Sequence, residues 1–537
     1  MQRDGETRRI AVSPPKAFEA RGRLFDALRQ AHPAVFEPRE LGEWGGYDAA
    51  IAFGGDADRA GSGEHDPAYR LFFPDGAATP GRTRVQLADA AALDPVLRER
   101  RLDEDHAGAQ PLAVAPGETV LAAAGRDPLW SSTAGGAVHR AAVAPPDLCS
   151  RSGLRTLLGP RRWLSLVPLE HFLREVTAPL AWELPPLRAA LMYDDPNLHW
   201  PSYGRLRFAD LAQHASLHGY HAAIAMVPLD GRFVHPSVGK LFRERADVLS
   251  LAMHGNDHIR LELYRDMRPD VRCAVIAQAL RRSDAFERRY GIQVDRVMSG
   301  PHGLSAEDAI AAMFSLGVEG FAGDWPFPWA PPDTPPDGWP LAGWQPAQLI
   351  HGLPVLPRSL FTSPADDVVF RAFLRQPLIA YGHHDAGGDV LGAVARHVNG
   401  LGDVRWQSLE EIARSNYAVR RAGATLLVKP YSRRFAVEVP AGVDELVVEV
   451  DAGYGTLAPP VVDAVSAGAP LAGAAASGGR RSFLPPEGGG MVEIVLRPAV
   501  PVDPERVAEP PWGSWPVFRR VLTEARDRTL LFIRPES

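Results

Sequence analysis

Five short apolar runs in the middle of the chain each end directly in polar, chemically capable residues, and this pattern constrains the fold more than any other. The runs have the length and character of buried strands, and stretches with helical periodicity lie between them. Strands that alternate with helices predict a parallel sheet, either open or closed into a barrel. In a barrel the carboxyl ends of all strands meet at one face, where active sites lie. The runs are Leu187–Met192, Val248–Met253, Asp295–Met298, Gly317–Ala322 and Leu378–Tyr381.

Two of these run ends carry residues with the character of metal ligands. Asp194 and Asp195 follow the first run, and His254 and His258 follow the second at a spacing of four residues. A carboxylate oxygen and two imidazoles leave a divalent metal with an open position for water or substrate. The second carboxylate is then free to act as a base, which predicts metal-assisted hydrolysis. Each pair alone also has an ordinary explanation, since such histidine pairs and Asp-Asp turns are common.

The polar residues that follow the five runs, taken in chain order, resemble the sequence motifs of the polysaccharide deacetylases. These are the NodB-like carbohydrate esterases of family 4, whose fold is a distorted (β/α) barrel. The likeness spans about residues 185–418, less than half of the chain. In that family the first motif ends in a doubled aspartate, the second holds two histidines four apart, the third holds Pro-x-Gly, the fourth ends in Asp-Trp and the fifth contains a histidine. The matching positions are Asp194–Asp195, His254 and His258, Pro301 and Gly303, Asp324–Trp325, and His383.

The resemblance implies a metal centre and a base. Asp195, His254 and His258 would hold one divalent metal ion, with zinc as the first choice. Asp194 would be the general base that takes a proton from metal-bound water. A bound metal lowers the pKa of water so far that a carboxylate can complete the deprotonation near neutral pH.

The resemblance also implies the residues that complete the reaction. His383 would protonate the leaving amine, with Asp324 to orient and charge it and His384 as the reserve candidate. Trp325 would form a wall of the acetyl pocket. A backbone N–H near His302 would stabilise the oxyanion together with the metal.

A polar and aromatic segment with His199, Trp200 and Tyr203 follows the first run. Aromatic faces stack on pyranose rings, so this segment can bind a sugar, but an ordered surface loop explains it equally well. His199 is therefore a candidate for binding a carbohydrate substrate.

Two positions depart from the family pattern. Ser299 stands where the third motif has an arginine that pairs with the base, and Arg296, three residues earlier, is the substitute that the sequence offers. Gly255 stands where the second motif has a Ser or Thr whose hydroxyl would brace the metal-binding loop. Either another cation reaches Asp194, or the base behaves differently.

The combined pattern predicts a metal-dependent hydrolase that removes an N-acetyl group from an amino sugar in a polysaccharide or its precursor. Two alternatives stay open. A glycosidase on a related barrel would need two carboxylates that flank a glycosidic bond, and the Asp-Asp pair beside two histidines favours metal chemistry instead. A non-catalytic carbohydrate-binding protein on a degenerate barrel is favoured by the missing arginine and disfavoured by the intact Asp-His-His set.

The flanking regions predict two further domains. Strand-like and helical stretches before the barrel indicate an open α/β domain, similar in pattern to flavodoxin-like or glutamine-amidotransferase-like domains, and a connector follows it. After the barrel, short strands between Gly and Pro turns predict a β-sandwich, closed by a helix over Pro516–Arg526 and a last strand over Thr529–Ile533. The predicted domains are residues 1–145, the connector 146–185, the barrel 186–420 and the β-rich domain 421–537.

Composition and hydropathy limit the expected binding partners of the protein and its expected location. The 537 residues carry a net charge of −7 without a basic cluster, which argues against nucleic-acid binding. The two cysteines, Cys149 and Cys273, are expected to be free thiols. No apolar run approaches the length of a membrane span and no apolar segment follows the first residues, so the expected location is the cytoplasm. The expected partner is the carbohydrate substrate alone.

Overall fold

The fold is given by a computed structural model, which describes residues 7–54, 66–74, 81–105, 109–133, 135–147, 162–324, 345–363, 365–383, 388–450, 460–475 and 479–533. The chain divides into two compact units. Unit 1 comprises Met1–Glu183, Ala330–Gln345 and Pro364–Leu374, and unit 2 comprises Leu184–Trp329, Pro346–Ser363 and Arg375–Ser537.

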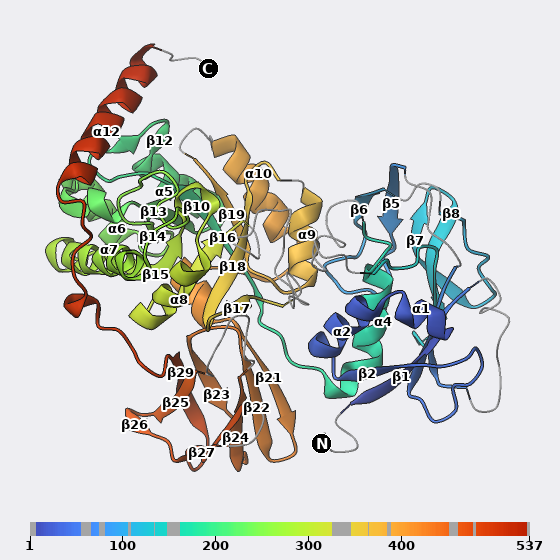
Figure 1. The fold of residues 1–537 in the computed structure, drawn as a ribbon. Helices are drawn as coiled ribbons and strands as arrows, with labels where there is room; N and C mark the ends of the chain where they lie inside the picture. Colours follow the sequence, from blue (N-terminus) through green and yellow to red (C-terminus); the bar gives the residue numbers. More distant parts are fainter. Residues whose placement is uncertain are drawn as a thin grey trace. The chain divides into compact units, whose positions relative to one another are not determined.

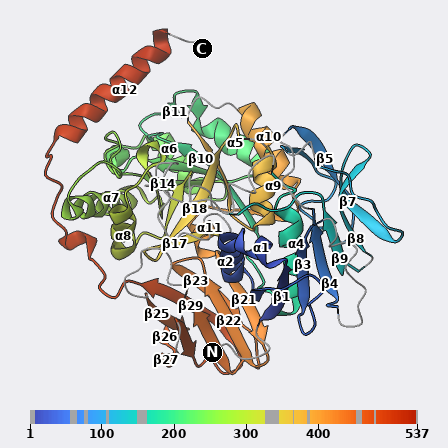
Figure 2. The same cartoon turned by 45° about the vertical axis from the view of Figure 1, so that its right-hand side comes forward.

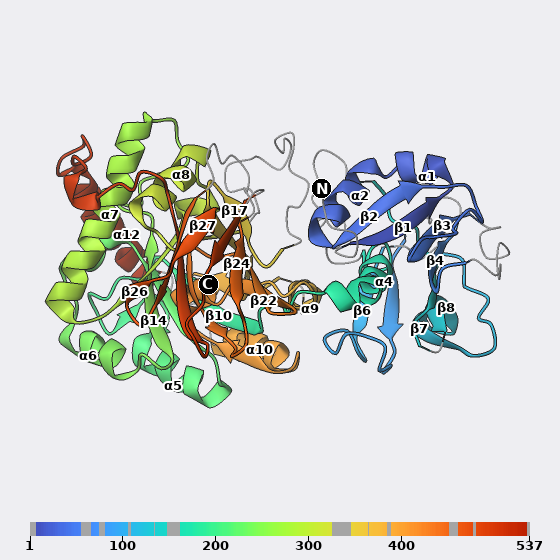
Figure 3. The same cartoon turned by 90° about the horizontal axis from the view of Figure 1, so that it is seen from below.

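Unit 1 is built on a nine-stranded sheet with the order β2-β1-β3-β4-β9-β8-β7-β5-β6. Strands β2, β1, β3, β4 and β9 run parallel, and the pairs from β9 to β6 are antiparallel. Helices α1 and α2 contact β1 and β2, and α4 contacts β4 and β9 (Figure 3). The predicted open α/β sheet is confirmed. The elements are β1 Arg8–Ser13, α1 Pro15–Glu19, α2 Gly22–Ala31, β2 Ala34–Pro38, β3 Ala49–Phe53, β4 Tyr69–Phe73, β5 Thr83–Leu87, β6 Arg101–Glu104, β7 Glu118–Ala124, β8 Asp127–Thr133, β9 Val138–Ala141, α4 Val167–Thr177, η1 Ala178–Leu180 and α9 Ala365–Phe373.

The core of unit 2 is a closed barrel of seven parallel strands, in the order β13-β14-β15-β16-β18-β19-β10, which closes where β10 pairs with β13. Strand β20 extends the sheet beside β10, and β17 pairs antiparallel with β18. This is the predicted distorted (β/α) barrel. The strands are β10 Leu187–Asp194, β13 Ala222–Met226, β14 Leu249–His254, β15 Val294–Ser299, β16 Gly320–Gly323, β17 Gln348–Ile350, β18 Leu353–Leu360, β19 Leu378–Gly382 and β20 Val404–Trp406.

Helices surround these strands (Figures 1 and 2). Helices α5, α7 and α8 each end at a glycine with a left-handed backbone, the usual C-terminal stop for a helix. The shorter elements of the barrel region are the β11–β12 hairpin and two 3₁₀ turns. The bounds are β11 Ser202–Tyr203, β12 Leu206–Arg207, α5 Phe208–His218, η2 Pro228–Arg232, α6 Pro236–Glu244, α7 Pro269–Tyr290, η3 Pro301–Gly303, α8 Glu307–Leu316, α10 Gly388–Asn399 and α11 Leu409–Arg414.

All five predicted strand runs form barrel strands, and the polar residues that follow them lie at one end of the barrel. Strand β10 shows why: each of its residues is buried, as expected for a strand covered on both faces. Strand β18 was not predicted. Its sequence LPVLPRSL contains Pro354 and Pro357, and proline within a run argues against a central strand.

A β-sandwich follows the barrel in unit 2. A five-stranded sheet, β21-β22-β24-β28-β27, and a four-stranded sheet, β23-β29-β25-β26, share one apolar core. Phe435, Val448 and Ile494 are among its fully or almost fully buried members. The predicted sandwich is confirmed. The strands are β21 Tyr417–Ala422, β22 Thr425–Pro430, β23 Arg434–Val439, β24 Glu445–Glu449, β25 Val461–Ser466, β26 Ala469–Pro470, β27 Gly473–Ala475, β28 Arg480–Phe483 and β29 Gly490–Arg497.

The C-terminal segment contains the short turn η4 (Pro504–Arg506) and helix α12 (Trp515–Ile533). The predicted last strand over Thr529–Ile533 is wrong, because the helix continues through these residues. No glycine interrupts the sequence from Trp515 to Ile533, and its one proline, Pro516, lies in the first turn, where helices tolerate it.

No helix among the described residues is long and apolar enough to cross a membrane. Cys273 is a free thiol, and burial raises its pKa. Cys149 lies outside the described residues.

Candidate metal centre

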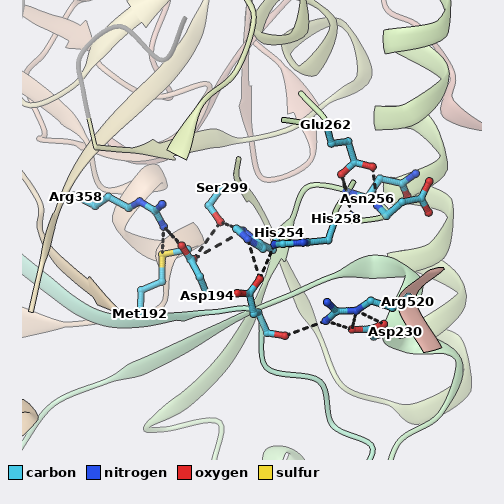
Figure 4. Close-up of polar contacts among 12 residues, drawn as sticks. Met192, Asp194, Asp230, His254, Asn256, His258, Glu262, Ser299, Arg358 and Arg520 are labelled. Atoms are coloured by element: carbon cyan, nitrogen blue, oxygen red, sulfur yellow. Dashed lines mark hydrogen bonds and ion pairs between the residues drawn. The ribbon is translucent and has the colours of Figure 1, made fainter. Parts of the chain in front are cut away.

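Three predicted ligands converge at the carboxyl ends of β10 and β14 (Figure 4). Asp195 Oδ1 lies 2.8 Å from His258 Nε2 and 3.2 Å from His254 Nε2. One ligand atom from each residue lies within 4.8 Å of the others. Strand β10 ends at Asp194 and β14 ends at His254, so the two strands that flank β13 supply the set.

The donor set fits a divalent cation. Asp195 Oδ1 is buried and has no hydrogen-bond partner, although two imidazole nitrogens lie beside it. His254 Nδ1 lies 2.7 Å from Ser299 Oγ, and a proton donated there leaves the Nε2 lone pair directed at Asp195. A carboxylate oxygen beside two imidazole nitrogens is a set of donors that a divalent cation can join.

Two of the three ligands have a left-handed backbone that residues other than glycine rarely adopt. The φ angle is 82° at Asp195 and 53° at His258. Such conformations persist only where the surroundings fix them, and they gather at functional sites. The side chains are thereby aimed at each other across the rim.

The adjacent Asp194 is buried and paired with a cation that the sequence analysis missed. Arg358 Nη1, on β18, lies 3.0 Å and 2.8 Å from the two carboxylate oxygens of Asp194. Its Nε donates to Asp324 Oδ1 at 2.7 Å, and its guanidinium lies 3.8 Å from the centre of the Tyr381 ring. Burial lowers the pKa of Arg358, but the two carboxylates more than offset it and hold that pKa above its usual range. One arginine thus bridges both predicted catalytic aspartates.

Arg296, the substitute offered by the sequence, does not serve this purpose. Its guanidinium pairs with Asp284 and Glu287. Ser299, at the position of the missing arginine, instead donates to Asp194 Oδ1 at 3.4 Å while it contacts His254. The cation expected from the third motif is therefore supplied by another strand.

The loop from His254 to His258 is braced by Glu262, which the sequence analysis also missed. Its carboxylate accepts the backbone N–H groups of Asn256 and Asp257 at 2.8 Å and that of His258 at 3.2 Å. Burial and the charge of Asp257 raise the pKa of Glu262 to about 7, although the three N–H groups oppose the shift. Glu262 braces the loop in place of the hydroxyl that the family pattern has at residue 255.

Gly255 is required by this arrangement. Its φ is 58°, and a Cβ there would lie 2.5 Å from Glu262 Oε2 and 2.7 Å from Pro301 Cγ. A Ser or Thr at this position would displace the carboxylate. The departure from the family pattern therefore has a local steric cause.

The residues that were predicted to complete the reaction have the following surroundings. Asp324 also accepts the hydroxyl of Tyr381 at 2.6 Å. His302 is exposed, and its ring centre lies 5.7 Å from that of His258. His383 directly follows β19 and is exposed. The predicted acid and pocket roles of these residues stay predictions, and Trp325 and His384 lie outside the described residues.

The ring of His199, the predicted sugar-binding residue, is engaged by protein groups. Its Nε2 lies 2.9 Å from the carbonyl of Asp230 and its Nδ1 3.3 Å from Glu524. These contacts favour the interpretation of an ordered loop over direct binding of a sugar.

A second group of two histidines and a carboxylate lies in unit 1. Glu175 lies 2.6 Å from His139 Nε2 and 3.6 Å from His171 Nδ1. Trp130 Nε1 donates to His139 Nδ1 at 3.3 Å, so the proton of neutral His139 lies on Nε2 and is donated to Glu175. His139 thus offers no free lone pair to a metal at this point, in contrast to His254. We assign this group to structural hydrogen bonding.

No protein-family model matches the chain, and no curated protein matches it. Solved structures similar to the chain include the T48 deacetylase with substrate, at 13% identity over 42% of this chain and 90% of that one, with a TM-score of 0.26. They also include the family 4 carbohydrate esterase from Streptomyces lividans in complex with acetate, at 11% identity over 42% and 94%, with a TM-score of 0.26.

BA3943, a family 4 pseudoenzyme from Bacillus anthracis, is similar at 9% identity over 42% of this chain and 65% of that one, with a TM-score of 0.27. Carbohydrate esterases and deacetylases of family 4, pseudoenzymes among them, are thus among the structures similar to this chain. At such values the similarity says nothing about substrate, and the chemistry has to be argued from the site.

Proposed function

We propose that the barrel is a metal-dependent hydrolase that removes an N-acetyl group from an amino sugar, in a polysaccharide or its precursor. The observation that carries the proposal is the convergence of Asp195, His254 and His258 on one point, beside a second carboxylate that a buried arginine orients. This is the donor set of a catalytic site for a divalent metal, in which a position is left open for a reactant.

Each residue of the rim has a distinct task in this proposal. Asp195, His254 and His258 hold the metal, and zinc would supply Lewis acidity toward the acetyl carbonyl and water. Asp194 accepts the proton of the attacking water, because it lies directly beside the ligand set without belonging to it. Arg358 holds both carboxylate oxygens of Asp194 and so fixes the direction of the base.

Three further residues take part in stabilising the oxyanion and in the departure of the amine. His383 donates a proton to the leaving amine, which departs with the amino sugar while acetate forms. Asp324 accepts from Arg358 and Tyr381 and thereby carries a fixed negative charge beside the base. The backbone N–H near His302 donates to the developing oxyanion.

The contacts of Arg358 argue against the two alternatives, a glycosidase and a non-catalytic carbohydrate-binding protein. A glycosidase needs two carboxylates on opposite sides of the bond that is cleaved, whereas Asp194 and Asp324 share one guanidinium. A non-catalytic barrel was favoured by the missing arginine of the third motif. Arg358 supplies that charge from β18, so the absence at Ser299 no longer argues against catalysis.

Release of acetate tests the proposal. Full-length protein is incubated with N-acetylated glucosamine and galactosamine oligomers, after treatment with a chelator and after zinc is restored. We expect acetate with at least one oligomer, no acetate after chelation and recovery with zinc. Acetate release at the same rate in chelated protein would refute metal dependence, and no release from any N-acetyl sugar would refute the substrate class.

A further inference from the structure

The C-terminal segment contacts both ligand loops of the candidate metal centre. We infer that Arg519 and Arg520 of α12 are positioning residues that hold the backbone of Asp195 and His258 in the geometry that the metal requires. This inference rests on the proposed metal centre.

Arg520 ties the Asp195 loop to the neighbouring strand end. Its guanidinium is buried and makes a two-pronged ion pair with Asp230, with Nε at 3.1 Å and 3.0 Å and Nη2 at 2.6 Å from the carboxylate oxygens. Asp230 lies in η2, which follows β13, and is itself buried. The same Nη2 lies 3.5 Å from the carbonyl oxygen of Asp195.

Arg519 and Trp512 hold the loop of the second histidine. Arg519 Nη2 donates to the carbonyl of Asp257 at 3.1 Å and also to that of His258. Trp512 Nε1 donates to the fully buried Asp257 carboxylate at 3.1 Å. The loop is thus fixed on both sides of its backbone, since Glu262 takes its N–H groups and Arg519 takes its carbonyls.

The two arginines act on the two ligands that have a left-handed backbone. Asp195 and His258 are the ligands with positive φ, and α12 contacts the carbonyl oxygens of both. A strained backbone persists only where its surroundings determine it. Loss of these contacts would let each residue relax and move its side chain away from the common point.

The orientation of α12 supports a specific role for its polar face. Helices usually turn their apolar side to the protein, whereas here Arg520 is 7% exposed. Among the α12 side chains that the structure describes, four apolar ones on the other face are 53–60% exposed, namely Trp515, Phe518, Val521 and Leu522. Burial of these four side chains does not hold the helix in place, whereas the arginine contacts tie it to the two loops.

Zinc affinity and local exchange test the inference on the full chain. The variants are Arg519→Gln, Arg520→Gln and the pair Asp230→Asn with Arg520→Gln, which leaves no unpaired buried charge. Arg506→Gln is the matched control, since Arg506 lies in the same segment but is exposed and pairs with Asp503. Zinc affinity is measured by competition with a chromophoric chelator, and amide hydrogen exchange is followed in peptides over 193–199 and 254–262.

We expect zinc to bind about 10–100-fold more weakly in each test variant, as for other groups that orient metal ligands. We expect faster exchange at 254–262 in Arg519→Gln and at 193–199 in the Arg520 variants, with the control unchanged. Arg519 is only partly buried, so we expect Arg519→Gln to fold. Its zinc affinity and hydrogen exchange can then be measured even if the Arg520 variants do not fold. Unchanged affinity and exchange in folded Arg519→Gln would overturn the inference while wild-type zinc binding upholds the metal centre. Faster exchange in variants of a chain that binds no zinc even as wild type would refute the metal centre, and only a structural bracing of the two loops by the arginines would remain.

Discussion

At the scale of single residues, the adjacent aspartates at the end of β10 have different surroundings. Asp194 pairs with Arg358 inside the barrel, and Asp195 faces the two histidines. Successive side chains of a strand point to opposite faces, and the positive φ of Asp195 turns its side chain further. Neighbouring carboxylates can therefore perform separate tasks.

Substitution separates these tasks. Asp195→Asn should weaken zinc binding and activity together, because the amide keeps one oxygen but loses the charge that holds a dication. Asp194→Asn should keep zinc and reduce turnover by about 10²–10⁴-fold, the usual range for a lost general base. Metal content and acetate release, measured on both variants, check this. If Asp194→Asn empties the site and Asp195→Asn keeps zinc, the two roles are reversed.

Sequence alone predicted the three residues that converge and the carboxylate beside them, because all four lie just after runs with a clear strand signal. It could not identify Arg358, since the two prolines of β18 conceal the strand. It could not identify Glu262, because a single acid in a loop carries no local signal of the N–H groups it accepts. Contacts made across the barrel are tertiary and leave no periodic pattern in the chain.

At the scale of elements, the loop after β14 depends on a glycine that has no room for a side chain. The family pattern at residue 255 is Ser or Thr, yet a Cβ at Gly255 would collide with Glu262 and Pro301. The loop and its carboxylate brace form one unit, so the family residue does not fit here.

Gly255→Ser should therefore lower stability and zinc affinity instead of restoring the family pattern. The expected loss is about 1–3 kcal/mol of unfolding free energy, from the strained backbone and the clash. Gly468→Ser is the matched control, because Gly468 also has a positive φ but no atom within 4 Å of its would-be Cβ. Chemical denaturation of both variants measures the difference. Equal losses of unfolding free energy in the two variants would show that Glu262 does not occupy the space that a side chain at residue 255 needs.

The element pattern of the barrel was predictable where strands are apolar and uninterrupted, and α7 (Pro269–Tyr290) lies in one of the stretches with helical periodicity between them. The C-terminal strand was predicted from five residues with strand propensity, but a short apolar run is ambiguous between strand and helix. The helix that begins at Trp515 continues through it, because no glycine or internal proline interrupts the sequence.

At the scale of the whole molecule, the two compact units are interleaved in sequence. The predicted barrel limits 186–420 are contiguous, whereas unit 1 takes Pro364–Leu374 from inside them. That stretch holds α9, where Phe370 and Phe373 are buried and Phe370 packs edge-on against Trp163, with ring centres 4.7 Å apart.

A chain shortened to residues 184–537 should therefore fold poorly. Removal of Trp163 and its neighbours would expose Phe370 and Phe373, so we expect a lower midpoint of thermal unfolding and aggregation compared with the full chain. Phe370→Ser with Phe373→Ser should reduce the aggregation of the shortened chain. A shortened chain that is monomeric and as stable as the full one would contradict this account of α9.

Metal content of the purified full chain tests the metal centre most directly. Protein prepared without chelator and then exposed to zinc is analysed by elemental mass spectrometry, beside Asp195→Ala and the control Arg506→Gln. We predict one zinc per chain in the wild type and the control, and none in Asp195→Ala, because the anionic oxygen between the two histidines is lost. Zinc-free wild type, or one zinc retained by Asp195→Ala, would contradict the assignment of Asp195, His254 and His258 as the metal ligands.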